Sequence, residues 1–240
     1  MIGRFLEISI YTGDIKESLE FYEQLEFRQT SVGETWEHPY AVLSDGRLVL
    51  GLHQSELHSP SLTFVRPELS EHLSALEAAG IELDFRRTGD EHFNEAGFLD
   101  PDGHMIRMLE ARTFSPPAFD AHNFSLLGRF SEYSLPARDA ERSSEFWEPL
   151  GFVAAEQGED PVRHRRLISD GINMGFYETR EFREAVLVFR DDDIDSRLET
   201  LRAKGCELRR GFRDIADAQS STTLSTPEGT TILLLGEEGL

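Results

Sequence analysis

The sequence predicts an α+β fold of four βαβββ modules, grouped as two tandem domains. The first observation is a repeat at an offset of 125 residues, through which Glu7 recurs as Glu132 and Phe27 as Phe152. The second is a shorter repeat inside each half, because Ser61 starts the same strand-then-helix interval that Glu7 starts. Chance rarely keeps so many turn and apolar positions in phase, so repeated supersecondary units are the simplest explanation.

The first module reads as a strand, a helix and three strands. Residues 5–11 alternate apolar and polar side chains, which is the period of a half-buried strand. Asp14 stands three residues before Glu17 in the pattern of a helix capping box, and apolar residues follow at helical spacing. Two further strands, 40–44 and 48–52, are expected on either side of the hairpin signal Asp45-Gly46.

The second module repeats this order, with a helix that stops at Gly80 and the turn Asp100-Pro101-Asp102-Gly103 before its last strand. Residues 113–126 contain adjacent prolines and lose the periodicity, so we expect a linker there. The chain is thereby divided into a first domain of residues 1–112 and a second of residues 127–240. The second domain carries the matching turn Pro227-Glu228-Gly229.

Composition argues against several functions. The 45 acidic residues exceed the 24 basic ones and give a formal net charge of −21, so nucleic acid is a poor partner. No apolar run approaches the roughly 18 residues of a membrane span, and the start lacks the pattern of a secretory signal, so we expect a cytoplasmic protein. Cys206 is the only cysteine, which leaves neither a disulfide framework nor a thiolate metal cluster.

The four modules, the pairs Phe21-Tyr22 and Phe146-Trp147 at the first helix of each domain, and the Pro-Asp/Glu-Gly turns resemble the vicinal oxygen chelate superfamily. That superfamily includes glyoxalase I, extradiol dioxygenases, and the fosfomycin- and bleomycin-resistance proteins. The resemblance implies two tandem glyoxalase/bleomycin-resistance-like domains, each a curled mixed sheet around a cleft. It also implies a place for a divalent metal ion, held by oxygen and nitrogen ligands, on the inner face of the sheet.

The positions that the resemblance implies as metal ligands carry at most one donor in each domain. They are Glu7, Leu50 or Gly51, Ser61 and Arg107 in the first domain, and Glu132, Gly175 or Phe176, Val186 and Leu233 in the second. A guanidinium repels a divalent ion, and one carboxylate alone does not hold it. We therefore expect no metal and no cofactor. The resemblance to the bleomycin-resistance proteins then implies metal-independent binding or sequestration of a small organic molecule in the first domain's cleft.

The cleft face of the first domain is expected to be polar, because residues two apart on a strand share a face. The candidate ligand-binding residues there are Glu7, Ser9, Tyr11, Ser61, Thr63 and Arg107, with Tyr40 and His53 beside them. We expect Glu7 and Arg107 to pair across the cleft or to contact opposite ends of a polar ligand; alternatively, the pair closes a buried sheet junction.

The matching face of the second domain is more apolar. It is expected to carry Phe130, Glu132, Ser134, Val186, Val188 and Leu233. Glu132, also a candidate ligand-binding residue, then has no obvious cation unless a loop arginine such as Arg165 reaches it.

Other functions stay open at this point, and the sequence does not decide whether a reaction is catalysed. The main rival is a metal-dependent lyase or dioxygenase, glyoxalase-like, with an atypical metal shell on Glu7, His53 and Glu132. A structural module with vestigial clefts, or a metal-free enzyme with Glu7 as its base, are the others. Trp36, Tyr40 and Phe93 are candidate aromatic walls for a flat ligand. Tandem fusion already supplies a paired arrangement, so we expect a monomer or a weak homodimer.

Overall fold

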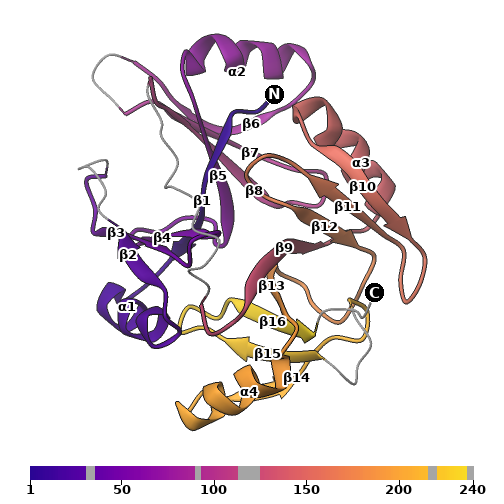
Figure 1. The fold of residues 1–240 in the computed structure, drawn as a ribbon. Helices are drawn as coiled ribbons and strands as arrows, with labels where there is room; N and C mark the ends of the chain where they lie inside the picture. Colours follow the sequence, from indigo (N-terminus) through magenta and orange to yellow (C-terminus); the bar gives the residue numbers. More distant parts are fainter. Residues whose placement is uncertain (31–35, 90–92, 113–124, 216–220, 237–240) are drawn as a thin grey trace.

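The computed structural model describes residues 1–30, 36–89, 93–112, 125–215 and 221–236, which form two eight-stranded sheets and few helices (Figure 1). The first sheet has the order β2-β3-β4-β1-β5-β8-β7-β6. Its strands are β1 (Arg4–Tyr11), β2 (Arg28–Thr30), β3 (Tyr40–Ser44), β4 (Val49–His53), β5 (Ser61–Arg66), β6 (Leu83–Arg87), β7 (Glu95–Leu99) and β8 (Met105–Glu110).

The second sheet repeats this order as β10-β11-β12-β9-β13-β16-β15-β14. Its strands are β9 (Arg129–Pro136), β10 (Val153–Gly158), β11 (His164–Ile168), β12 (Met174–Tyr177), β13 (Val186–Asp191), β14 (Leu208–Arg210), β15 (Ser221–Ser225) and β16 (Thr231–Gly236). The helices are α1 (Ile15–Gln24), α2 (Leu69–Ala78), α3 (Ala140–Trp147) with the short 3₁₀ turn Glu148–Leu150, and α4 (Ile194–Ala203). The predicted α+β class and the fourfold βαβββ repeat are confirmed.

Each sheet joins its two modules at the centre. The central pairs, β1 with β5 and β9 with β13, are antiparallel. Within a module the first strand runs parallel to the last, as β1 does to β4 and β5 to β8. A parallel pair needs a crossover, and the helix of each module lies in that crossover. The outer strands of each sheet do not pair with each other, so the sheets are curled but not closed into barrels.

The helix starts that the sequence predicts are confirmed for the first helix of each domain. The Asp14 side chain accepts hydrogen bonds from the backbone N–H groups of Lys16 and Glu17 at the start of α1. Asp139 caps α3 in the same way through Arg142. These bonds satisfy backbone donors that the helix itself leaves unpaired. Asp193 precedes α4 but makes no side-chain cap bond.

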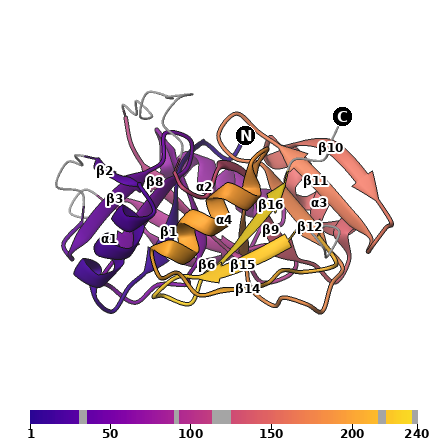
Figure 2. The ribbon, with the colours of Figure 1, turned by 60° about the horizontal axis from the view of Figure 1, so that its bottom comes forward.

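The two domains share one apolar core, which the sequence repeat did not reveal. Phe27 and Phe64 of the first domain contact Phe189 and Phe152 of the second, with ring centroids 6.5 and 6.3 Å apart. The backbone N–H of Ile2 also donates to the carbonyl of Leu150 over 2.7 Å. Figure 2 shows the two halves side by side. The inner faces that could hold a ligand lie on the other side of each sheet from this core.

A β-bulge in the first strand of each domain corrects two predicted side-chain directions. The register between β1 and β5 shifts between Phe5 and Glu7, so Phe5 rather than Leu6 packs against the core. In β9 the same shift places Phe130 against the core, where it contacts Phe189, and not in the second cleft as expected. An extra residue in a strand reverses the alternation on one side of the bulge.

Only Ser125 and Leu126 of the predicted linker, 113–126, lie among the described residues. Ser125 is fully buried, and the backbone N–H of Leu126 donates to the carbonyl of Leu25 over 3.0 Å. Leu126 therefore contacts the first domain, whereas the carbonyl of Ser125 accepts from Arg197 of the second domain over 2.9 Å, and the remaining boundary stays a prediction. Within the described ranges, none of the helices has the length and apolar character that a bilayer span requires.

Candidate functional site

The inner face of the first domain contains a buried carboxylate with three hydrogen-bond donors. Glu7 on β1 is completely buried. Its Oε1 lies 2.8 Å from Ser9 Oγ and 2.8 Å from Nε2 of His53 on β4, and its Oε2 accepts from the hydroxyl of Tyr40 on β3. Ser9 Oγ also lies 2.7 Å from Thr63 Oγ1 on β5. The predicted residues Glu7, Ser9, Thr63, Tyr40 and His53 thus form one network across four strands.

A glycine makes room for this carboxylate. Gly51 lies in β4 opposite Ser9 in the parallel ladder. A Cβ atom at this position would overlap the carboxyl group of Glu7. Gly175 has the same relation to Glu132 in the second domain. In the sequence, Gly51 only lacked a metal-binding side chain. In the structure, its missing side chain leaves the space that the Glu7 carboxyl group occupies.

A second histidine extends the network outward. Nδ1 of His53 lies 3.0 Å from Nε2 of His38. Burial, followed by the neighbouring His53 and Arg107, lowers the pKa of His38, which favours a neutral ring at neutral pH. Burial, followed by the negative charge of Glu7, raises the pKa of Tyr40 and keeps its hydroxyl protonated as a donor. A neutral His53 can carry its proton on Nδ1 and donate it to Nε2 of His38. In that tautomer Nε2 of His53 has a free lone pair that can bind a metal ion.

Trp36 covers the mouth of this network. Its ring centroid lies 5.1 Å from that of His53, 6.1 Å from that of Tyr40 and 5.5 Å from that of Phe93. The guanidinium carbon of Arg107 lies 5.2 Å from the centroid of the same ring, within cation–π range. The predicted aromatic walls therefore do meet in one place, with Trp36 directly beside the imidazole of His53.

Arg107 does not pair with Glu7, which corrects the expected contact across the cleft. Its Nη2 lies 2.9 Å from Oε2 of Glu95 on β7, and Arg87 binds the other oxygen of Glu95 at 2.9 Å. Nη1 of Arg107 is buried without a hydrogen-bond partner among the described residues. Beside this group lies a cavity of about 320 Å³ that Arg107, Glu95 and Phe85 help to line. The charge of Arg107 is thus neutralised by Glu95, away from Glu7.

Two other predicted residues take no part in the Glu7 network. Ser61 is buried on β5, and its Oγ has no hydrogen-bond partner within the part of the chain that the structure describes. Tyr11, at the end of β1, is 40% exposed, and its backbone N–H donates to Ser59 Oγ. The alternation of β1 places Tyr11 on the inner face, but at the open end of the strand.

The second domain holds its carboxylate differently. Glu132 accepts from Ser134 Oγ at 2.6 Å and from the hydroxyl of Tyr177 at 2.9 Å, and Nε of Arg166 lies 2.5 Å from its Oε2. Arg165, the loop arginine considered from the sequence, instead pairs with Glu141. The guanidinium of Arg166 supplies the cation that the sequence left unassigned.

Apolar side chains fill the rest of the second inner face. The buried cluster consists of Tyr177, Phe182, Val186, Val188, Leu233 and Leu235. The two domains also carry the same aromatic pair at exchanged positions. Tyr40 pairs with His53 across β3 and β4, whereas His164 pairs with Tyr177 across β11 and β12. Only the first domain therefore combines an imidazole with its carboxylate.

The donors around Glu7 fit a divalent ion in part. Within the described ranges, no group of three or more His, Cys, Asp or Glu side chains is placed to hold a metal. A carboxylate and an imidazole nevertheless converge in one buried place, with the phenol oxygen of Tyr40 beside them. Such oxygen and nitrogen donors suit iron, manganese or zinc, and a catalytic site leaves positions open for substrate. Arg166 excludes the same role for Glu132.

Three residues of these sites were missed or underweighted from the sequence. Glu95 and Arg166 were not singled out, because strand alternation alone does not fix the registers of β7 and β11. The contact between His38 and His53 was not expected either. The comparison of the two domains contains a signal for Arg166. Arg166 lies opposite Gly175 in the strand ladder, and the equivalent place in the first domain, opposite Gly51, holds the apolar Val42.

Comparison with known proteins supports this architecture. The family model described as Glyoxalase/Bleomycin resistance protein/Dioxygenase superfamily matches residues 4–108. A search of curated proteins found no match. Among solved structures, a catechol 2,3-dioxygenase superposes with a TM-score of 0.63 at 13% identity, over 99% of this chain and 88% of that one.

Two further solved structures agree with this likeness. The 2,3-dioxygenase LapB from a Pseudomonas species gives a TM-score of 0.65 at 11% identity, over 100% of this chain and 94% of that one. Homoprotocatechuate 2,3-dioxygenase from Arthrobacter globiformis gives 0.63 at 17% identity, over 98% and 80%. At such identities the likeness establishes the fold.

The expectation of metal-independent sequestration is wrong in the light of these neighbours, which are dioxygenases and favour the rival interpretation of a metal-dependent lyase or dioxygenase. One part of its physical premise also fails, because Arg107 pairs with Glu95 rather than standing as a free cation beside Glu7. The family model matches the first domain, and the same strand order occurs in both halves, so the chain has the tandem two-domain fold seen in the Glyoxalase/Bleomycin resistance protein/Dioxygenase superfamily.

Proposed function

We propose that the first domain is a metal-dependent enzyme of the ring-cleaving dioxygenase kind, acting on a small aromatic molecule with adjacent oxygen substituents. The observation that carries the proposal is the convergence of Glu7 and His53 under the aromatic ring of Trp36. The neighbouring structures are described as catechol and homoprotocatechuate 2,3-dioxygenases, which supports an aromatic diol as the substrate class.

Glu7 and His53 would be the protein ligands, with Tyr40 beside them. A bound divalent ion would polarise substrate oxygens and lower the pKa of substrate hydroxyls. Ser9 and Tyr40 donate to the Glu7 carboxylate and fix its orientation. His38 holds His53 through Nδ1, which is the second contact that orients a ligating imidazole.

Trp36 and Arg107 would position the substrate. A flat aromatic ring can stack on the indole of Trp36 in place of the contacts that Trp36 now makes. The unpartnered Nη1 of Arg107, at the edge of the 320 Å³ cavity, is available to an anionic substituent or a phenolate oxygen. Exclusion of water by Trp36 would strengthen each of these electrostatic contacts.

The test is metal retention followed by oxygen uptake. Protein purified without a histidine tag is loaded anaerobically with Fe(II) or Mn(II), desalted and analysed for metal. It is then mixed with catechol and air in an oxygen electrode. We expect close to one ion per chain and catechol-dependent oxygen uptake, both lost in Glu7→Gln and His53→Asn.

Glu132→Gln is the matched control, since it changes the equivalent carboxylate of the second domain. It should retain metal and activity. Equal retention of metal by Glu7→Gln and wild type, or retention of none of iron, manganese, zinc and nickel by wild type, would contradict the proposal. Retained metal without oxygen uptake from a panel of aromatic diols would refute the dioxygenase reaction while leaving the metal site.

A further inference from the structure

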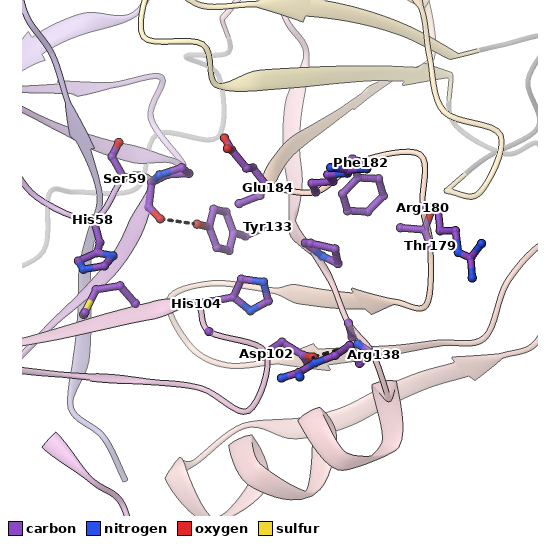
Figure 3. A pocket seen from close by; sticks show the side chains of 17 residues that line it. His58, Ser59, Asp102, His104, Tyr133, Arg138, Thr179, Arg180, Phe182 and Glu184 are labelled. Atoms are coloured by element: carbon purple, nitrogen blue, oxygen red, sulfur yellow. Dashed lines mark hydrogen bonds and ion pairs between the residues drawn. The ribbon is translucent and has the colours of Figure 1, made fainter. Parts of the chain in front are cut away.

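A cavity of about 740 Å³ lies at the seam between the two domains, apart from the Glu7 network (Figure 3). The first domain contributes the segment 58–60 before β5 and the turn 102–105 before β8. The second contributes the end of β9, the two residues that follow it, and the loop after β12. The hydroxyl of Tyr133 donates to the carbonyl of Pro60 over 3.3 Å and connects the two sides.

The charge of this cavity is opposite to that of the chain. Three arginines, Arg138, Arg180 and Arg183, line it against two carboxylates, Asp102 and Glu184. Asp102 is already bound by Arg138, with Oδ1 2.9 Å from its backbone nitrogen and 3.1 Å from its Nε. On a protein with a net charge of −21, such a concave region concentrates anions locally.

The arginines of the loop after β12 are free to bind a ligand. Arg180 and Arg183 are exposed, and neither forms an ion pair with the residues that the structure describes. Both lie in the same short segment as the buried ring of Phe182, which also lines the cavity. A guanidinium beside an aromatic wall favours an anionic group attached to an apolar body.

His104 supplies a fixed polar group on the floor. Its Nδ1 lies 2.8 Å from Oδ2 of Asp100, whose side chain is completely buried. Oδ1 of Asp100 accepts from the backbone N–H groups of Asp102 and His104, each at 2.9 Å, so the carboxylate itself is held in place. The ring stands between Tyr133 and Asp102 in Figure 3, and its side chain is 19% exposed.

This arrangement orients the free nitrogen of His104. A carboxylate on Nδ1 fixes the ring and its tautomer, so Nε2 of the neutral ring is a hydrogen-bond acceptor. The Nε2 edge of His104 is then available to a hydroxyl or N–H group of a ligand in the cavity. Tyr133 and Phe182 provide the apolar surfaces on either side.

We propose that the domain seam binds a small organic anion, a carboxylate or phosphate group on an apolar or aromatic body. Arg180 and Arg183 hold the anionic group, the body packs against Phe182 and Tyr133, and Nε2 of His104 accepts a hydrogen bond from a donor group on that body. This site is independent of the Glu7 network and does not rest on the proposed dioxygenase activity.

The test is isothermal titration with benzoate, phenyl phosphate and the uncharged benzamide. We expect benzoate or phenyl phosphate to bind one site per chain with a Kd of about 1 mM or tighter. Benzamide, which has the shape of benzoate without its charge, should bind at least about tenfold more weakly. The stronger of the two anions identifies the anionic group.

The decisive variant is Arg180→Ala/Arg183→Ala, which removes two exposed side chains. It should weaken binding of the anion at least about tenfold. Arg202→Ala/Arg209→Ala, at exposed positions outside the cavity, makes the same change in net charge and should leave binding unchanged. Binding that is absent for both anions, equal for benzamide, or weakened equally by the two double variants overturns the proposal.

Discussion

Replacement of Glu7 by glutamine is expected to lower the free energy of unfolding by about 2 kcal/mol. The change keeps the shape of the side chain but turns one acceptor oxygen into a donor. With the new NH₂ group toward Tyr40, the phenol loses its acceptor. With it toward His53, both the imidazole and Ser9 must reverse their hydrogen bonds.

The magnitude follows from the burial of the group. Glu7 and His53 have no exposed side-chain surface, so water does not replace a lost partner. One unsatisfied buried donor costs about 1–3 kcal/mol, and hydrogen bonds to a neutral amide are about half as strong as those to a carboxylate. The hydroxyl of Ser9 can rotate to restore one hydrogen bond. The expected loss in the free energy of unfolding therefore stays near the middle of that range.

Urea unfolding followed by tryptophan fluorescence measures this difference, since Trp36 lies over the network and Trp147 in the core. Glu20→Gln on the exposed face of α1 is the matched control and should change stability by less than about 0.5 kcal/mol. If Glu7→Gln stays within that same margin of wild type, the buried hydrogen-bond network does not exist as described.

Two further predictions concern stability. Gly51→Ala should destabilise the protein by about 1–3 kcal/mol through collision with the Glu7 carboxyl group, whereas Gly13→Ala, with open space around it, should be nearly neutral in urea unfolding. Burial raises the pKa of Asp102, but hydrogen bonds from Arg138 and Ser143 outweigh it and leave the pKa below its ordinary value. Its stabilising effect should therefore be present above about pH 4 and decline as the pH falls below that value. The Tm difference between wild type and Asp102→Asn should be largest near neutral pH and shrink toward pH 3; a difference that does not change with pH contradicts this account.

The sequence predicted the elements well because their signals are local. The strand over residues 5–11 and the caps at Asp14 and Asp139 depend only on neighbouring residues, and each was confirmed. The bulges at Leu6 and Ser131 escaped because a regular alternation in the sequence does not show where a strand carries an extra residue, and that residue changes which side chain faces the core.

Sequence analysis selected residues that the structure brings together, but it did not predict all of their partners. Strand alternation brought Glu7 and His53 to one face correctly, since both lie on strands with fixed pairing. The partner of Arg107 depends on the register of β7, which follows a turn and a short strand, and Glu95 was therefore not foreseen. The seam cavity escaped altogether, because a repeat identifies units but not the surfaces through which they meet.

The continuous apolar interior makes the second domain an obligate scaffold for the first. If residues beyond the first domain were removed, Phe27 and Phe64 would lose the aromatic rings that the second domain packs against them. Melting should consequently be a single event, and a damaged core residue in either half should weaken the other half as well.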